Sequence, residues 1–241
     1  IGTAVGTFFN GANFSINDMN FSKWDNMWYG LEAVTNPHNV ALGLSIFALS
    51  RILAIHYIQK NVDETAILEK SKNALWFNTL LFLVVFLYWL IKLLFIEGFA
   101  YDPDTMLVAK EKYKYLHNIL EMPLNTIILL TGIVLVLFGI IKSLFTNFQN
   151  AIFYSGLGTV LTVFAIFILA GFNNTCFYPS ISDLQSSLHI QNASSSHYTL
   201  TAMSYVSLAV PFVLAYIIYA WRSINIKKID QKEMESETHL Y

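Results

Sequence analysis

Charged residues are scarce in this chain, since Asp, Glu, Lys and Arg make up only 12% of its 241 residues. Soluble domains carry about 25% charged residues. Apolar residues account for 55% and the mean hydropathy is +0.51, so the composition excludes an ordinary soluble domain and predicts a membrane protein. The formal net charge of −2 also excludes the broadly basic surface that a nucleic-acid partner would require.

Cysteine and the sequence motifs of soluble catalysis are also lacking. Cys176 is the single cysteine, so it can form neither an intrachain disulfide nor a cysteine-based metal site, and we interpret it as a small apolar residue. The chain contains no glycine-rich phosphate loop, no Cys-x-x-Cys or His-Glu-x-x-His motif and no nucleophile elbow. The chemistry that these motifs support is therefore not expected.

Long apolar runs are what the chain has instead. Five blocks, approximately residues 40–58, 74–96, 124–145, 151–172 and 200–221, are each long enough for a helix to cross hydrocarbon about 30 Å thick. The opening run, residues 1–9, is too short to cross, and we interpret it as the outer half of a helix whose beginning is missing. The predicted fold class is all-α: a polytopic transmembrane helix bundle over residues 1–225 with five complete spans plus the end of a sixth, followed by a cytoplasmic tail over residues 226–241.

Prolines mark the start of two predicted spans and interrupt a third. Asn36-Pro37 and Met122-Pro123 each place a proline near the first helical turn, where its missing amide hydrogen is not needed. Pro211 lies inside the fifth span and predicts a kink there. The fourth span carries small residues over positions 155–162, which indicate close helix packing rather than a ligand site.

Two connecting segments have enough pattern to form structure of their own. Residues 21–34 mix Trp24, Trp28 and Tyr29 with charged side chains, which predicts a short helix at the lipid headgroups. Residues 104–121 place Ala109 and Leu116 among apolar positions at helical spacing, which predicts a second outer helix. An ordinary solvated connector is the alternative for both segments.

Positive charges are unevenly divided between the two sides of the predicted bundle. The side that holds the carboxy terminus carries eight Lys and Arg residues and the opposite side carries four, while residues 173–199 contain none. Because cytoplasmic segments carry the excess of positive charge, we expect the carboxy terminus to lie in the cytoplasm.

Two polar side chains inside the first complete span are candidates for function. Arg51 lies roughly 12 Å from the inner end of its helix, where a charge needs a partner or water; snorkelling toward the cytoplasmic headgroups is the alternative. His56 is nearer the inner end and is the one histidine of six close to a position suited to haem ligation, which needs inward-facing histidines at matched depth. A hydrogen-bonded or capping histidine is the preferred interpretation.

Two further charges lie at outer span ends. Lys92 is near Glu97 and can snorkel toward the outer surface. Glu121 is expected to pair with Lys114 or His117, and a role in proton exit is the alternative. Arg51, His56, Lys92 and Glu121 are thus the candidates for an intramembrane charge or a proton-related role.

Four stretches of the chain occur together in a specific order. They are the opening run through Gly11-Ala12-Asn13-Phe14, the Asn36-Pro37 pair before a long span, residues 192–203 and the tail from residue 229 to residue 241. In this combination the chain resembles subunit II of the cytochrome bd-type quinol oxidases over essentially its whole length. The specificity comes from joint occurrence at this spacing, since each stretch alone is a weak signal.

The resemblance implies a complete subunit of eight spans, of which this chain would lack the amino-terminal third. It implies a heterodimer in the bacterial inner membrane that oxidises quinol and reduces dioxygen to water with protons taken from the cytoplasm. Haem b and haem d would belong to the partner, subunit I. Subunit II would support that partner, help shape proton or oxygen access, and be able to hold a quinone as a lipid-like component. The resemblance is compatible with either ubiquinol or menaquinol as substrate and with either haem d or haem b at the oxygen site. It is also compatible with an additional small single-span subunit.

The resemblance transfers no catalytic, cofactor-binding or metal-binding residue to this chain. The acidic and tryptophan-rich motif that the family links to proton entry belongs to the amino-terminal part. Arg51 stands where the family pattern leads us to expect an apolar residue. The predicted function is therefore that of a non-haem-binding membrane subunit of an oxygen-reducing quinol oxidase.

Two other classes of membrane protein remain as alternatives. A secondary transporter, or a fragment of one, usually shows paired broken helices or inverted repeats, and here only Pro211 interrupts a span. A eukaryotic membrane protein would explain the Asn-x-Ser/Thr triplets on the predicted outer face, which begin at Asn13, Asn20, Asn173 and Asn192. Short polar loops produce such triplets by chance, so the oxidase subunit is the preferred interpretation.

Overall fold

The computed structural model describes residues 1–17, 19, 21–146 and 148–224 of the chain. Five helical segments are long and apolar enough to cross a membrane. They are α3 (Pro37–Asn61), α4 (Thr65–Phe95), α6 (Pro123–Phe145), α7 (Ala151–Gly171) and a last segment, His197–Ile224, which consists of α9 (His197–Ser207) and α10 (Val210–Ile224). The predicted all-α polytopic bundle is confirmed, and the tail predicted over residues 226–241 lies outside the described residues.

Short elements precede and connect these spans. Two antiparallel hairpins pair β1 with β2 and β3 with β4. The short elements are α1 (Gly2–Val5), α2 (Thr7–Asn10), β1 (Phe14–Ile16), β2 (Ser22–Trp24), a 3₁₀ helix (Leu31–Thr35), β3 (Glu97–Tyr101), β4 (Val108–Lys112), α5 (Lys114–Glu121), a second 3₁₀ helix (Leu184–Ser186) and α8 (Ile190–Ala193).

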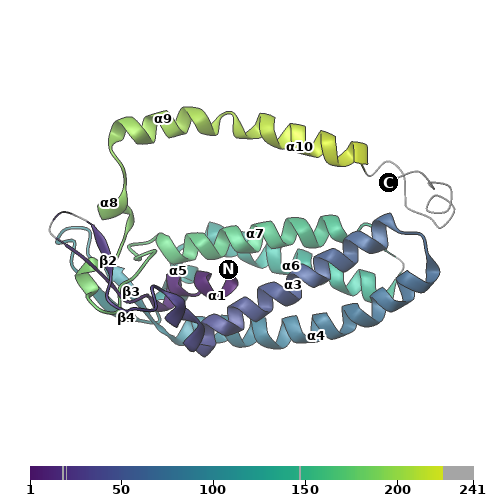
Figure 1. The fold of residues 1–241 in the computed structure, drawn as a ribbon, viewed down its shortest axis with the longest axis horizontal. Helices are drawn as coiled ribbons and strands as arrows, with labels where there is room; N and C mark the ends of the chain where they lie inside the picture. The colour runs from purple at the N-terminus through teal and green to yellow at the C-terminus, as the bar shows by residue number, and fades with distance from the viewer. Residues whose placement is uncertain (18, 20, 147, 225–241) are drawn as a thin grey trace.

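The bundle has two different ends (Figure 1). Both hairpins gather at one end, which we call the cap. At the other end α3 turns into α4 through residues 62–64, and α6 leads into α7; we call this the turn end. α10 also finishes at the turn end. The two ends therefore differ in construction, with folded connectors on one side and helix turns on the other.

The helix starts predicted at prolines are confirmed. Pro37 occupies the first turn of α3, and the Asn36 side chain accepts a hydrogen bond of 3.0 Å from the His38 amide. Pro123 opens α6 in the same way. α4 begins at Thr65, well before the apolar run at Ala74, so its first turns are polar and extend the helix beyond the hydrophobic block.

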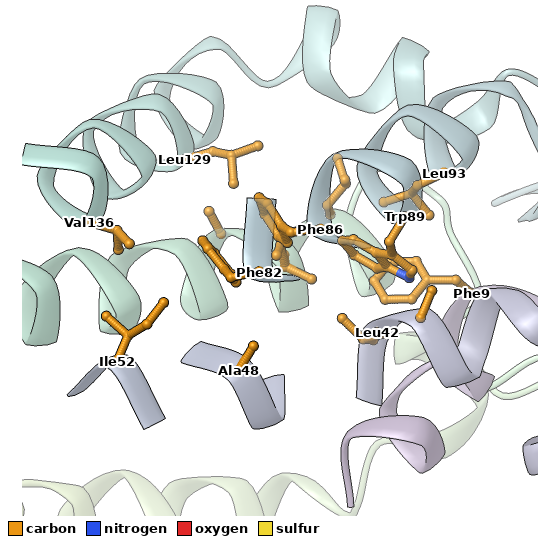
Figure 2. Packing of buried hydrophobic residues seen from close by; sticks show 14 of the residues in the cluster. Phe9, Leu42, Ala48, Ile52, Phe82, Phe86, Trp89, Leu93, Leu129 and Val136 are labelled. Atoms are coloured by element: carbon orange, nitrogen blue, oxygen red, sulfur yellow. The ribbon is translucent and has the colours of Figure 1, made fainter. Parts of the chain in front are cut away.

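Large aromatic side chains fill the core near the cap (Figure 2). Phe9 and Trp89 are fully buried and meet edge to face at 5.6 Å between ring centroids. Tyr115 packs on Phe9 at 5.3 Å and donates its hydroxyl to the Phe9 carbonyl at 3.1 Å. These contacts hold the opening run of the chain, α1 and α2, against α4 and α5. Such aromatic pairs add about 0.5–1.5 kcal/mol beyond their area burial.

Small residues let α6 and α7 approach closely, as the sequence predicts. A Cβ atom on Gly158 would lie 2.6 Å from the Gly132 carbonyl oxygen and 2.7 Å from the Val136 nitrogen. A Cβ atom on Gly132 would lie 2.5 Å from the Thr162 hydroxyl. At these distances a methyl group on either glycine would overlap the neighbouring helix. The two helices can therefore pack this closely only because these positions carry no side chain.

The two predicted outer helices are largely wrong. Residues 21–34 contain β2 and a 3₁₀ helix, with no α-helix among the residues described there. Residues 104–121 contain β4 first and then α5, so only the second half is helical. Val108 at the start of β4 is buried, and Tyr113 at φ 59° separates the strand from α5. Pairing with β3, a segment earlier in the chain, decides the outcome.

The break predicted at Pro211 is confirmed. α9 ends at Ser207 and α10 begins at Val210, since a proline at position 211 has no amide to donate to Ser207. No residue of α9 or α10 is buried, and the segment runs alongside the other four spans (Figure 1). Trp221 meets Tyr57 of α3 edge to face at 6.0 Å near the turn end.

The glycines of α7 provide a matched pair for testing the α6–α7 contact. Gly158→Ala should destabilise the protein by about 1–3 kcal/mol, because its methyl group would overlap α6 backbone. Gly156→Ala should be neutral or stabilising by up to about 1 kcal/mol, because nothing lies within 4 Å of its Cβ position. Thermal unfolding in detergent measures both, and equal stabilities would contradict this packing.

Cys176 lies in the cap and is completely buried, as its interpretation as a small apolar residue requires. Burial raises the pKa of the Cys176 thiol to about 12. We therefore expect the folded protein to resist maleimide at pH 8 and to react fully after unfolding in denaturant. A cysteine at the exposed Ser194 is the positive control, and rapid native labelling of Cys176 itself would show that the cap is open.

Candidate functional site

A cluster of buried polar side chains joins four helices near the turn end. It consists of His56 and Gln59 on α3, Ser71 on α4, Ser143 on α6 and Ser155 on α7, and we call it the turn-end cluster. All five side chains are buried. Polar groups removed from water must find partners inside the protein, so the position of each hydrogen in the cluster is informative.

Ser155 determines the state of His56. Its hydroxyl lies 2.7 Å from the Ala151 carbonyl of its own helix and 2.8 Å from Nδ1 of His56. A hydroxyl has one hydrogen, and the carbonyl can only accept it, so the serine oxygen accepts from Nδ1–H of His56. In a neutral ring the other nitrogen, Nε2, then carries a lone pair. No described residue donates a hydrogen bond to Nε2.

Gln59 continues the cluster toward the turn end. Its amide oxygen accepts from the Ser143 hydroxyl at 2.5 Å, and its amide nitrogen donates to the Ser71 hydroxyl at 3.2 Å. Ser71 in turn donates to the Leu68 carbonyl at 2.7 Å. The chain of hydrogen bonds thus crosses from α6 through α3 to α4 and holds the glutamine side chain in one orientation.

A pocket of about 360 Å³ opens beside this chain of hydrogen bonds at the turn end. Gln59 and Ser143 line it together with Thr65, Glu69, Lys72 and Thr146. Its walls combine hydroxyls, amides and one charge of each sign with the apolar side chains of Leu68 and Phe148, so polar groups that can bind water are set in a largely apolar lining. A second, apolar cavity of about 170 Å³ lies at the centre of the bundle, and Leu42, Phe82, Phe86, Val136 and Ile166 are among its lining residues.

A different histidine is fully engaged at the cap end of α3. His38 Nδ1 lies 2.9 Å from the Asn10 amide nitrogen, and Nε2 lies 3.1 Å from the Trp89 carbonyl oxygen. The ring also stacks on Trp89 at 5.7 Å. Asn10 binds Asn39 as well, at 2.6 Å. His38 therefore ties α2 to α3 and α4, a structural role that its position at a span end did not reveal.

The two predicted charges inside or near spans have aromatic neighbours. Arg51 is exposed on α3, with its guanidinium carbon 5.8 Å from the Phe47 ring centroid, and it forms no ion pair with a described residue. Lys92 lies 3.5 Å from the Tyr88 hydroxyl. The structure brings neither residue toward His56 or toward the other, so the four candidates do not form one site.

The pairing predicted for Glu121 is wrong. Glu121 accepts a hydrogen bond of 2.6 Å from the Asn173 side chain. Lys114 and His117 instead pair with Glu111 of β4, at 3.3 Å and 2.8 Å. Burial alone would raise the pKa of Glu111, but the His117 hydrogen bond and the Lys114 charge outweigh it and hold that pKa below its usual value. The β4 strand, which the helix prediction missed, brings Glu111 to this place.

The sequence contained only a partial signal for the turn-end cluster. His56 and Gln59 are three residues apart on one helix, so they share a face. Ser143 and Ser155 lie inside or beside apolar runs. A serine in such a run commonly donates a hydrogen bond to a backbone carbonyl of its own helix, so its presence there does not indicate a contact with another helix. The partner of His56 is far away in sequence, and only the packed structure identifies it.

A comparison with known protein families decides the identity of the chain. The model of the family described as cytochrome bd terminal oxidase subunit II matches residues 1–224. The chain belongs to the cytochrome bd terminal oxidase subunit II family. No curated protein matches the chain. Family membership makes this subunit II chain a membrane component of a quinol oxidase complex that also contains a partner subunit.

Haem is the cofactor of such complexes, and the histidines of this subunit II chain fit it poorly. Both ring nitrogens of His38 are engaged, His117 is bound to Glu111, and His189 stacks on Tyr101 at 4.1 Å in the cap. His56 has one unengaged nitrogen, but no second described histidine faces it across the bundle. No group of three His, Cys, Asp or Glu suited to a metal ion occurs among the described residues.

Asn118 holds in place the segment that contains Asn173, the hydrogen-bond partner of Glu121. It is fully buried, donates to the Leu169 carbonyl at 3.1 Å and to the Thr175 hydroxyl at 2.8 Å, and accepts from Asn173 at 3.0 Å. Asn118→Ala should lower the free energy of unfolding by about 2 kcal/mol or more, because buried partners lose their hydrogen bonds. Glu121→Gln keeps an acceptor for Asn173 and should change it by less than about 0.5 kcal/mol. Denaturant titration measures both, and similar values for the two variants would contradict this account.

Proposed function

We propose that this chain is the non-haem-binding membrane subunit of a cytochrome bd-type quinol oxidase in the bacterial inner membrane. It packs against subunit I, which carries the haem b and haem d groups, and it helps shape proton or oxygen access. The observation that carries the proposal is that the described histidines present no matched pair to iron. Both nitrogens of His38 are engaged, and the unpartnered nitrogens, Nε2 of His56 and Nδ1 of His189, lie near opposite ends of the bundle. Redox chemistry then takes place in the partner.

The exposed last segment supports a subunit made for assembly. α9 and α10 expose large side chains on all sides, among them Tyr205, Phe212 and Trp221. A segment of this composition contacts lipid or other transmembrane helices when it is in a membrane. The remaining four spans are continuous helices, and the paired broken helices of many secondary transporters are not found among them.

The central apolar cavity supports a role in the access of apolar species. Its lining exposes almost no polar surface to the cavity. Dioxygen and the isoprenoid tail of a quinone are apolar and enter such spaces without a desolvation cost. In this proposal the cavity between α3, α4, α6 and α7 accommodates dioxygen or a quinone tail, and the turn-end cluster binds water and protons.

The charges indicate the orientation of the subunit. Lys60, Lys70, Lys72, Lys142 and Arg222 lie on or beside helix ends at the turn end, so the proposal places this end and the carboxy terminus in the cytoplasm. Arg51 then snorkels toward the cytoplasmic headgroups and Lys92 toward the outer ones, each beside an aromatic ring. Glu121 serves as a hydrogen-bond acceptor of the cap rather than as a proton exit.

Purification from native membranes tests the proposal. A tag on this chain should retrieve a larger haem-containing subunit, and the preparation should consume oxygen when quinol is supplied. The same chain purified alone should show no haem absorption, because its described histidines offer no pair of free nitrogens at matched depth. A haem b spectrum in a one-to-one ratio with the isolated chain, or purification without any haem-bearing partner, would overturn the proposal.

A further inference from the structure

We propose that Nε2 of His56 is a proton-binding site that exchanges protons with the turn-end side through the pocket beside Gln59 and Ser143. The inference deepens the proposed function and rests on it for its direction, since an oxidase that reduces dioxygen draws protons from the cytoplasm. The step forms one N–H bond and breaks one O–H bond: a hydronium ion in the pocket gives a proton to Nε2, which converts neutral imidazole to imidazolium and leaves a water molecule. It returns by the reverse transfer, and no oxidant or reductant takes part.

The hydrogen bonds of His56 leave a base in the right place. Ser155 accepts Nδ1–H and gives its own hydrogen to Ala151, so Nε2 carries the lone pair. Five buried side-chain atoms of the described residues lack a hydrogen-bond partner, and Nε2 of His56 is the basic one within the spans. Such an atom points to a functional role or a bound water. The same serine can continue to accept from Nδ1–H after Nε2 is protonated, so this hydrogen bond is kept in both protonation states. Nε2–H has no described acceptor, so the protonated state requires a water molecule beside it.

Gln59 lies between the pocket, which it lines, and His56, which does not line it. Gln59 follows His56 by one helical turn, and side chains at this spacing are about 5–6 Å apart at Cβ. Gln59 and Ser143 each face the pocket and bind one another. Their remaining hydrogen-bonding capacity can orient water between the pocket and His56. The central cavity offers no comparable route, because its lining is apolar.

The charged and titratable groups around the turn-end cluster come from all four helices. Glu69 and Lys72 of α4 line the pocket and balance each other in sign. Lys60 of α3 lies over the Phe153 ring at 3.7 Å and Lys142 of α6 lies 5.8 Å from the Phe138 ring, while Tyr154 of α7 packs on Phe138. No described carboxylate forms an ion pair with His56. A proton on His56 therefore has no fixed counter-charge, and in this proposal water that enters from the pocket is the hydrogen-bond partner of Nε2–H.

Infrared spectroscopy on the assembled oxidase tests the protonation itself. The complex is reconstituted in liposomes with ring-labelled histidine, and the pH is changed on one side at a time. We expect one histidine band that follows the pH on the turn-end side, is missing in His56→Gln and is shifted in Ser155→Ala. Identical bands in wild type and His56→Gln, or a band that follows only the opposite side, would overturn the inference. If His56→Gln fails to assemble, a shift of the histidine band in Ser155→Ala identifies that band as His56. An unshifted band in Ser155→Ala would overturn the inference.

Cysteine labelling tests the route. Ser143→Cys should react with a small cationic methanethiosulfonate from the turn-end side, and its modification should abolish the pH response of the histidine band. Ser45→Cys, which faces the apolar cavity, is the matched control and should not react; buried Cys176 adds little background. Modification that leaves the pH response intact would overturn the route. A chain that titrates normally in liposomes but never copurifies with a haem-bearing subunit would refute the proposed function alone.

Discussion

Hydrocarbon offers no hydrogen bonds, and this constraint explains how the interior of the protein is built. Polar side chains within the spans bind backbone carbonyls or one another. Asn125 of α6 donates to the Ala165 carbonyl of α7 at 3.1 Å, and Thr162 donates to the Gly158 carbonyl at 2.8 Å. The Asn125 bond joins two neighbouring helices, where the apolar contact alone would be unspecific, whereas the Thr162 bond lies within α7. Nε2 of His56 has no hydrogen-bond partner among the described residues, and neither do the Thr79 hydroxyl, Nε1 of Trp89 and the Asn125 amide oxygen. The imidazole nitrogen is the base among these four atoms.

The cap follows a different rule, because it lies beyond the spans and is assembled from distant parts of the chain. Ile181 donates its amide to the Ala12 carbonyl at 2.9 Å, and Cys176 donates to the Phe99 carbonyl at 2.8 Å. Each segment alone is too short to be stable in water. Together they close one end of the bundle and fix the opening run of the chain, whose Phe9 fills the core between α4 and α5.

Polar and apolar spaces are separated by depth in the bundle. The polar pocket lies at the turn end and the apolar cavity lies at the centre. A subunit that supports a neighbouring redox centre benefits from this division, because protons need polar steps whereas dioxygen and quinone tails need apolar ones. The same four helices form both spaces, so α3, α4, α6 and α7 are the functional scaffold in our proposal, and the exposed α9 and α10 provide surface for assembly.

Composition and apolar run length by themselves determined that the chain forms a membrane helix bundle, where five of its spans lie, and that Pro211 breaks the last one, because helix formation in lipid is a local requirement. The small residues of the fourth span also indicated that it packs closely against another helix, and the structure identifies that helix as α6. The strands of the cap, the true partner of Glu121 and the hydrogen bond between His56 and Ser155 were decided by tertiary structure alone. His56 and Ser155 are 99 residues apart in the chain, and no local pattern specifies which distant residues will meet once the helices have packed.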